Sequence, residues 1–184
     1  FGFENPQQCL LSPLRPDFQP QGAFPAPGYN GHLDRAVGRI APQHPVDPIL
    51  IEGLPGSGQV GKLVAEYMIH ALGAEKIGEI NSLYFPPQVI LDENGTARLA
   101  RNELYLWHSE TKDIVFLVGD HQSTTGEGHY ILADFYCEIA EELKTRRIYS
   151  LGGFGVGHLV PEARVLGAVN RPELKAEMEA AGVT

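Results

Sequence analysis

An unbroken run of apolar residues, Ile114-Val115-Phe116-Leu117-Val118, constrains the fold of this 184-residue chain more than any other feature. A strand with one face in water alternates apolar and polar residues, whereas a strand covered on both faces is apolar throughout. We therefore expect a strand over residues 113–119 in a sheet that is covered on both faces. A chain of this length can bury a core large enough for one such domain.

Strand and helix patterns alternate from residue 49 onward. Short apolar runs predict strands over residues 49–51, 76–82, 147–151 and 164–169. Helical spacing of apolar residues predicts helices over residues 62–72, 126–144 and 171–181. Between them, residues 84–108 have the pattern of a β-meander, with a turn at Asn94-Gly95. This order predicts an α/β sandwich with a mixed, mostly parallel sheet.

The helix ends carry their own signals. Thr124 and Glu127 have the spacing of a capping box, which places the start of the second helix near Gly126. Asn170 is expected to cap the last helix, with Pro172 in its first turn. The sequence stops soon after this helix, so we expect the domain to be incomplete at its C-terminal end.

The first 48 residues differ in composition from the rest. They contain nine of the fourteen prolines, and proline fixes φ and lacks the amide donor that helices and central strands need. We expect an extended N-terminal arm over residues 1–48, with a short exception around His32–Ile40. An α/β domain over residues 49–184 follows.

Charge and cysteine content exclude several classes of protein. The formal net charge of -9 argues against nucleic acid and against an anionic membrane surface, because both are bound by clustered Lys and Arg. No run of about 18 apolar residues exists that could span a bilayer. Cys9 and Cys137 are too far apart in sequence to suggest a disulfide framework or a metal site. We expect a cytoplasmic protein in which Cys137 is a small packing residue.

A glycine-rich segment follows the first strand of the α/β domain. Its residues Gly56-x-Gly58-x-x-Gly61 match the dinucleotide fingerprint, and Gly56-x-x-x-x-Gly61-Lys62 is nearly a P-loop. Leu63 stands where a P-loop needs a Ser or Thr hydroxyl for Mg²⁺, which argues against nucleotide hydrolysis. Two interpretations remain: the glycines allow a tight turn and close helix packing, or the amides of the helix start hold a phosphate or carboxylate.

A second glycine-rich loop, Gly152–His158, follows the strand over residues 147–151. It is either a tightly turned loop or a backbone nest for an anion. Glu52, Asp120 and this loop lie at strand ends, where open parallel sheets bind ligands, so we expect a shallow pocket there. The candidate ligand-binding residues are Gly56, Gly58, Gly61, Lys62, Asp120, Gly153 and Gly155.

Catalytic patterns are otherwise weak. No Gly-x-Ser-x-Gly nucleophile elbow is present, and no two histidines have the i, i+4 spacing of a zinc helix. Asp120 and His121 are adjacent in an extended segment, so their side chains point in opposite directions. We predict no catalytic residue, no metal site and no cofactor, and an enzyme is the less favoured interpretation.

The segment Tyr84-Phe85-Pro86-Pro87 places two aromatic residues beside a rigid diproline. One interpretation is a core plug followed by a rigid turn. The other is an exposed apolar patch, formed by Tyr84, Phe85, Pro86 and Pro87, that binds a partner or a second subunit.

Five segments in order resemble the Pac2 family of proteasome-assembly chaperones. They are Ile51-Glu-Gly-Leu-Pro-Gly56-Ser-Gly58-Gln-Val-Gly61-Lys62, Tyr84-Phe-Pro-Pro-Gln88-Val89, Gly119-Asp120-His-Gln122, Ile148-Tyr149-Ser-Leu-Gly152-Gly153-Phe-Gly155-Val-Gly157, and Arg164-Val165-Leu-Gly167-Ala168. The resemblance covers residues 49–184 and is closest to archaeal members. No counterpart of the arm is evident.

The resemblance implies a three-layer α/β fold similar to that of nucleoside phosphorylases. It also implies self-association and, as in some members, chaperoning of proteasome subunits. We therefore expect an assembly chaperone or scaffold whose partners are proteasome subunits and further copies of itself. The alternative is a phosphate- or nucleoside-binding protein or enzyme that uses the Gly56-Ser57-Gly58-x-x-Gly61 loop.

Overall fold

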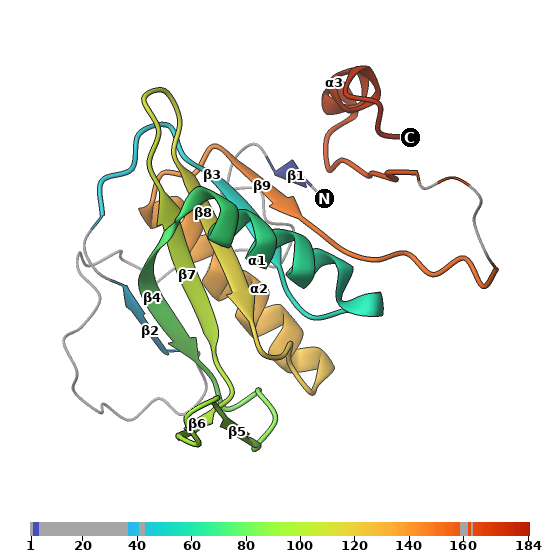
Figure 1. The fold of residues 1–184 in the computed structure, drawn as a ribbon. Helices are drawn as coiled ribbons and strands as arrows, with labels where there is room; N and C mark the ends of the chain where they lie inside the picture. The colour runs from blue at the N-terminus through green and yellow to red at the C-terminus, as the bar shows by residue number, and fades with distance from the viewer. Residues whose placement is uncertain (1, 4–36, 41–42, 159–161, 163) are drawn as a thin grey trace.

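A seven-stranded sheet forms the centre of the computed structural model, which describes residues 2–3, 37–40, 43–158, 162 and 164–184 (Figure 1). The strands follow the order β1-β9-β3-β8-β7-β4-β2 across the sheet. Their bounds are β1 Gly2–Phe3, β2 Val37–Ile40, β3 Ile49–Gly53, β4 Glu75–Asn81, β7 Asn102–Trp107, β8 Ile114–Gly119 and β9 Arg147–Ser150.

The centre of the sheet is parallel and its flanks are antiparallel. β3 pairs in parallel with both β8 and β9. β7 pairs antiparallel with β8, β4 with β7, β2 with β4, and β1 with β9. The predicted mixed sheet of an α/β protein is therefore confirmed. The strand predicted over residues 113–119 is β8, which lies at the centre of the sheet.

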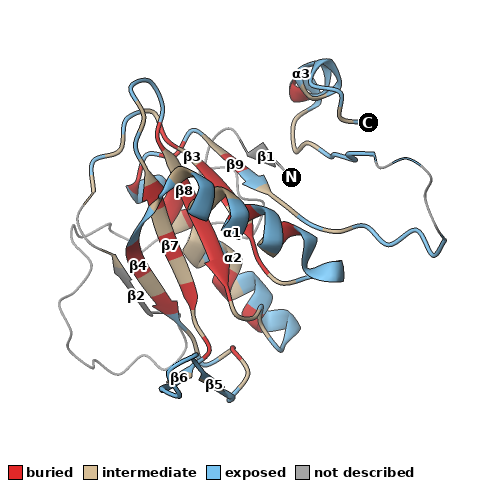
Figure 2. Ribbon diagram, in the orientation of Figure 1, coloured by how far each residue is buried: buried red, intermediate tan, exposed pale blue. Residues whose placement is uncertain are grey.

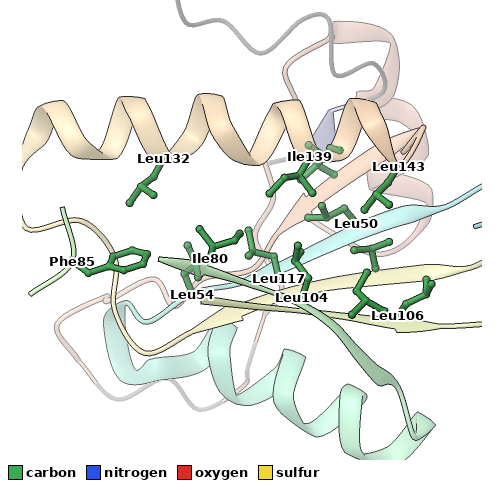
Figure 3. Close-up of a cluster of buried hydrophobic side chains, with 14 of the residues drawn as sticks. Leu50, Leu54, Ile80, Phe85, Leu104, Leu106, Leu117, Leu132, Ile139 and Leu143 are labelled. Atoms are coloured by element: carbon green, nitrogen blue, oxygen red, sulfur yellow. The ribbon is translucent and has the colours of Figure 1, made fainter. Parts of the chain in front are cut away.

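Two helices cover the two faces of the sheet (Figure 3). α2, Gly126–Glu142, covers one face, and α1, Val60–Leu72, covers the other. The three-layer arrangement implied by the family resemblance is therefore confirmed. Beyond β9 the chain extends to a 3-10 turn, Pro172–Leu174, and the short helix α3, Lys175–Ala180 (Figure 1).

The hydrophobic core lies between the sheet and α2. Its sheet side is built from alternate residues of the strands, such as Leu104 and Leu106 of β7, because successive strand side chains point to opposite faces. Leu132, Ile139 and Leu143 come from α2 and its C-terminal end. Figure 3 shows the two sets facing one another. Deleting one such side chain typically costs 2–5 kcal/mol, so this layer supplies much of the stability.

The contact between α1 and the sheet is built from small residues. A Cβ atom added to Gly53 would overlap the Cβ of Ala65 and come within 2.5 Å of the Gly61 carbonyl oxygen. A Cβ added to Gly61 would overlap the carbonyl oxygen of Leu151. The close helix–sheet packing that was one interpretation of the glycines is present at Gly53 and Gly61.

Residues 84–108 differ from the predicted meander. β5, Val89–Leu91, and β6, Ala97–Leu99, form a separate two-stranded sheet, whereas β7 joins the main sheet between β4 and β8. The turn between β5 and β6 is held by Asp92, whose carboxylate accepts from the amides of Asn94 at 2.9 Å and Thr96 at 2.7 Å. This hairpin lies beyond the end of the main sheet (Figure 1).

The predicted strand over residues 164–169 is wrong. The amide of Gly167 donates to the Thr184 carbonyl and the amide of Thr184 donates to the Val165 carbonyl, both at 3.0 Å. The segment therefore pairs with the end of the chain. Asn170 does not cap the last helix, because its Oδ1 is buried without a hydrogen-bond partner.

Two further local expectations need correction. The cap of α2 is Thr125, which accepts from the Gly128 amide at 3.0 Å, because Thr124 instead donates to the Tyr84 carbonyl. Cys137 is buried in α2, as expected of a packing residue, but it is joined in a disulfide, so the expectation drawn from the cysteine spacing that no disulfide forms is wrong. Cys9 lies outside the described residues.

The first 48 residues contribute both edge strands, β1 and β2, in their described parts. Edge positions suit a proline-rich stretch, because an edge strand leaves one row of amides unpaired. The expected short element near residue 40 corresponds to β2, Val37–Ile40. Most of the arm lies outside the described residues, so the boundary between residues 48 and 49 stays a prediction.

Candidate functional site

The C-terminal ends of the parallel strands bring the two glycine-rich loops together. The Leu151 amide donates to the Glu52 carbonyl at 2.8 Å, which joins the exits of β9 and β3. The side-chain amide of Gln122, beyond β8, donates to the Pro55 carbonyl at 2.5 Å. The segments predicted to meet at this edge of the sheet therefore do meet.

The glycines of the first loop differ in what their backbone requires. Gly58 has φ of +61°, a left-handed conformation that disfavours other residues, whereas Gly56 is extended and exposed. A side chain at Gly153 would overlap the Ser57 carbonyl, so the second loop packs directly on the turn before α1. Gly155 is exposed, with no atom near the position of a Cβ. Ligand binding by Gly56, Gly58, Gly61, Gly153 and Gly155 stays a prediction.

Asp120 forms an ion pair that sequence reasoning missed. Its two carboxylate oxygens accept from the guanidinium of Arg98, at 2.5 Å and 2.9 Å, and one also accepts from the Arg101 amide at 3.0 Å. Burial raises the pKa of Asp120, but these hydrogen bonds outweigh burial and hold the pKa below its usual value. Because Arg98 belongs to β6, the pair anchors the hairpin to the end of β8.

Lys62 is also engaged within the chain. Its ammonium lies 3.6 Å from the Glu66 carboxylate, one helical turn further along α1. The roles of Lys62 and Asp120 in binding a ligand stay predictions, and each side chain has a structural partner that such a ligand would have to replace.

A buried polar group lies on the other face of the sheet, below this edge. Burial raises the pKa of Glu52, although a hydrogen bond with Ser150 opposes the shift. Burial and the negative charge of Glu52 both raise the pKa of Tyr136 on α2. The Tyr136 hydroxyl contacts the side-chain amide of fully buried Asn102 at 2.6 Å.

Asn102 completes its hydrogen bonds with backbone carbonyls. With its oxygen accepting from Tyr136, its nitrogen donates to the carbonyls of His121 at 3.1 Å and Arg101 at 3.2 Å. Carboxyl groups whose pKa is raised by burial are more frequent at functional sites than elsewhere, which makes Glu52 a candidate functional residue. The sequence marked Glu52 by its position, but Tyr136 was indistinguishable from the apolar residues of its helix.

A charged network covers part of the opposite sheet face, beside α1. The ammonium of Lys76 on β4 contacts Glu79 at 2.5 Å and Glu103 at 2.6 Å, and Arg101 donates to Glu103 at 2.8 Å. Tyr105 donates to Glu103 at 2.8 Å. These charges compensate one another within the chain. No group of metal-binding side chains occurs in the described part of the chain.

The diproline segment divides between core and surface. Phe85 is 5% exposed and belongs to the hydrophobic core, so the hypothesis of an exposed partner patch is wrong for this side chain. Tyr84 also packs against the core, and its carbonyl accepts from Thr124. Pro86 is half-buried and Pro87 is exposed. Partner contact by Tyr84, Pro86 and Pro87 stays a prediction.

Three groups of large apolar side chains are among those exposed in the described residues. The hairpin exposes Val89, Leu91 and Leu99; the outward side of α1 exposes Val60, Leu63, Val64 and Tyr67; and the segment after β9 exposes Phe154, Val165 and Leu166. Sequence periodicity identified the apolar residues of α1 but not the direction in which they point. No helix in the described part of the chain is long and apolar enough to cross a bilayer.

Comparison with known proteins gives a consistent family. The PAC2 family model matches residues 50–184. An uncharacterized protein of Methanocaldococcus jannaschii, MJ1210, is 39% identical over 147 residues, which are 80% of this chain and 56% of the relative. The chain thus spans little more than half of that protein's length.

Solved structures of archaeal proteins share the fold. The crystal structure of Pyrococcus furiosus PbaB, an archaeal proteasome activator, matches with 35% identity and a TM-score of 0.76, over 80% of this chain and 63% of PbaB. Pyrococcus furiosus PbaA, an archaeal homolog of proteasome-assembly chaperone, matches with 23% identity and a TM-score of 0.61, over 80% of this chain and 62% of PbaA. At that identity, the second likeness concerns the fold alone.

Proposed function

Because the chain belongs to the PAC2 family, we propose that it is a protein-binding assembly chaperone or scaffold whose partners are proteasome subunits. The observation that carries this proposal is the 35% identity to PbaB, an archaeal proteasome activator, together with a TM-score of 0.76. Self-association and a cytoplasmic location are part of the proposal. The chain spans 63% of PbaB, so the proposal concerns the shared domain.

The β5–β6 hairpin is the surface that we assign to the protein partner. Val89 pairs with Leu99 across the two strands, and Leu91 lies two residues along, so all three side chains share one face. They are 62%, 66% and 67% exposed, respectively. An exposed apolar face of this kind is typical of a protein contact surface.

The other face of the hairpin is fixed to the domain. Ile90 packs against the core, and Arg98 is paired with Asp120. A rigid apolar surface binds a partner at a lower entropic cost than a mobile one. Pro87, which is also exposed, lies two residues before the start of β5.

Native mass spectrometry of the chain mixed with α- and β-type proteasome subunits from its own source tests the proposal. We expect a stoichiometric complex with the wild-type chain and little or none with Leu91→Asp, which places a charge in the apolar face. Tyr130→Asp is the matched control, because Tyr130 is 60% exposed on the far side of α2. A folded wild-type chain that forms no complex contradicts the function. A complex that Leu91→Asp leaves intact contradicts the assigned surface only.

Small-molecule binding at the Gly56-Ser57-Gly58-x-x-Gly61 loop stays the alternative prediction. A ligand that binds the native state raises the melting temperature by mass action. Phosphate or a nucleoside should therefore raise Tm in the wild type and not in Gly58→Val, since Val at a φ of +61° distorts the loop. An unchanged Tm across a panel of phosphate, nucleosides and nucleotides would exclude this alternative.

A further inference from the structure

We propose that the outward face of α1 pairs with α1 of a second copy of this chain, antiparallel and about a two-fold axis. The inference deepens the self-association that is part of the proposed function, and it assigns a surface to it. Binding of proteasome subunits is assigned to the hairpin, so the two surfaces can be tested separately.

The apolar residues of α1 face away from its own domain. Val60, Leu63, Val64 and Tyr67 are 46%, 60%, 43% and 72% exposed, and Figure 2 shows much of α1 in the colour of exposed residues. Their i, i+3, i+4, i+7 spacing is that of a helix–helix seam. The inward side is already occupied, because Gly61 and Ala65 are buried against the strands. A helix that is apolar on both sides requires cover on both sides.

These four residues form an apolar stripe on α1. The stripe suits a second copy, because the spacing of its residues is the same when the helix is read in reverse. In an antiparallel pair centred between Leu63 and Val64, these two residues oppose one another and Val60 opposes Tyr67. Each contact then places a larger side chain against a smaller one. A two-fold interface uses the same patch on both subunits, so it requires a self-complementary pattern of this kind.

The charges beside the stripe are also self-complementary. Lys62 and Glu66 flank it on one side, 3.6 Å apart within the copy. They lie on opposite sides of the proposed axis, so Lys62 of each copy comes beside Glu66 of the other, with an offset of one residue, about 1.5 Å along the helix. An unrelated partner would not need flanking charges that complement themselves.

Exposed apolar area also lies beyond the helix α1. α1 has thirteen residues, about 20 Å of length, whereas a stable interface buries roughly 800 Å² on each partner. Phe154 supplies further apolar area: it is 77% exposed, and it follows Gly153, where an added Cβ would lie 3.1 Å from the Cγ2 of Val60. The loop that carries Phe154 therefore packs beside Val60, the first residue of the stripe.

Sedimentation equilibrium of the chain, without proteasome subunits, tests the apolar part of the contact. We expect a monomer–dimer equilibrium whose Kd rises at least about tenfold in Leu63→Asp and in Tyr67→Ser, since each change is present twice in the dimer. Tyr130→Ser is the control, because it removes an equally exposed tyrosine from α2. A monomer at all concentrations, or a Kd that neither α1 variant raises, overturns the inference and leaves the hairpin experiment unaffected.

Charge exchange tests the antiparallel geometry. Lys62→Glu and Glu66→Lys should each raise Kd about threefold to thirtyfold, because each places like charges across the interface. An equimolar mixture of the two variants should restore the wild-type Kd, since every cross-subunit pair is again opposite in charge. Circular dichroism checks that both variants stay helical. A mixture no tighter than the single variants overturns the antiparallel arrangement.

Discussion

The two helical layers of this domain are built in opposite ways. α2 turns Leu132 and Ile139 toward the sheet, and its N-terminus is capped by Thr125. α1 turns Gly61 and Ala65 toward the sheet, has no side-chain cap, and exposes its larger apolar residues. The α2 layer thus buries its large apolar residues within the chain, whereas the α1 layer leaves large apolar side chains exposed.

The difference shows that an apolar stripe does not by itself indicate which side of a helix is buried. In α1 the buried side is set by backbone approach, because only glycine and alanine fit where the helix meets β3 and the Leu151 carbonyl. The stripe is then left on the outside. Substitutions in the two layers should therefore have opposite consequences for stability and association.

The largest effect is expected at the small-residue contact of α1. Gly61→Val should destabilise the domain by about 4 kcal/mol or more, because its side chain would overlap the backbone of Leu151. Urea unfolding followed by circular dichroism measures the change.

Gly56→Ala is the control, since its Cβ would meet only the Gln122 side chain at 3.8 Å and its backbone is extended. It should change stability by less than about 0.5 kcal/mol. Equal destabilisation by the two substitutions would contradict the packing explanation of Gly61.

A pair of leucine substitutions compares the two layers directly. Leu132→Ala should cost about 2–5 kcal/mol, because Leu132 is 2% exposed in the core under α2. Leu63→Ala should cost less than about 0.5 kcal/mol in dilute, monomeric protein, because Leu63 is 60% exposed. Unfolding of both variants at low concentration checks this, and similar losses would show that α1 packs inward.

Asp113 lies directly before β8, at one end of the sheet that α1 and α2 cover. Its carboxylate accepts from the amides of Val46 at 2.8 Å and Ser109 at 3.0 Å, and it contacts the His108 ring at 2.9 Å. Asp113→Asn should cost about 1–3 kcal/mol, because buried amides lose a charged acceptor. Asp134→Asn, on the exposed side of α2, should have little effect.

The Asp113 carboxylate also predicts how the stability of the domain depends on pH in the acid range. Burial raises the pKa of Asp113, but the hydrogen bonds outweigh burial and leave the pKa below its usual value. Its stabilisation is therefore complete above the unfolded pKa of about 3.9 and is lost as pH falls through the lower, folded pKa. The cost of Asp113→Asn should shrink as pH falls through this window. A pH-independent cost would contradict the assignment.

The smallest effect is expected at the cap of α2. Thr125→Ala should cost about 1 kcal/mol by removing the acceptor for the Gly128 amide. Thr124→Ala should cost less, since the Thr124 amide still donates to the Tyr84 carbonyl. Thermal unfolding of the two variants checks the difference, and the reverse order would restore the capping-box prediction.

Much of the fold could be predicted from local sequence. The continuous apolar run of β8 indicated a covered central strand, and close helix packing was one of the two interpretations of the glycine-rich segment after the first strand, because both signals lie within a few residues. The strand expected over residues 164–169 failed because its pairing depends on Thr184 rather than on its own apolar pattern.

The candidate site was less predictable. Sequence placed Glu52 and Asp120 at strand ends, but the pairing of Arg98 with Asp120 and that of Asn102 with Tyr136 are tertiary contacts that no spacing reveals. The burial of Phe85 in the core depends on long-range packing of the same kind.

Amide hydrogen exchange of α1 and α2 at increasing protein concentration tests most directly whether the α1 layer is completed by a second copy. We predict that α1 amides exchange faster than α2 amides in dilute protein. They should slow as concentration rises, because the dimer suppresses local opening of α1. Exchange in α1 that is as slow as in α2 and independent of concentration would contradict this account of the two layers.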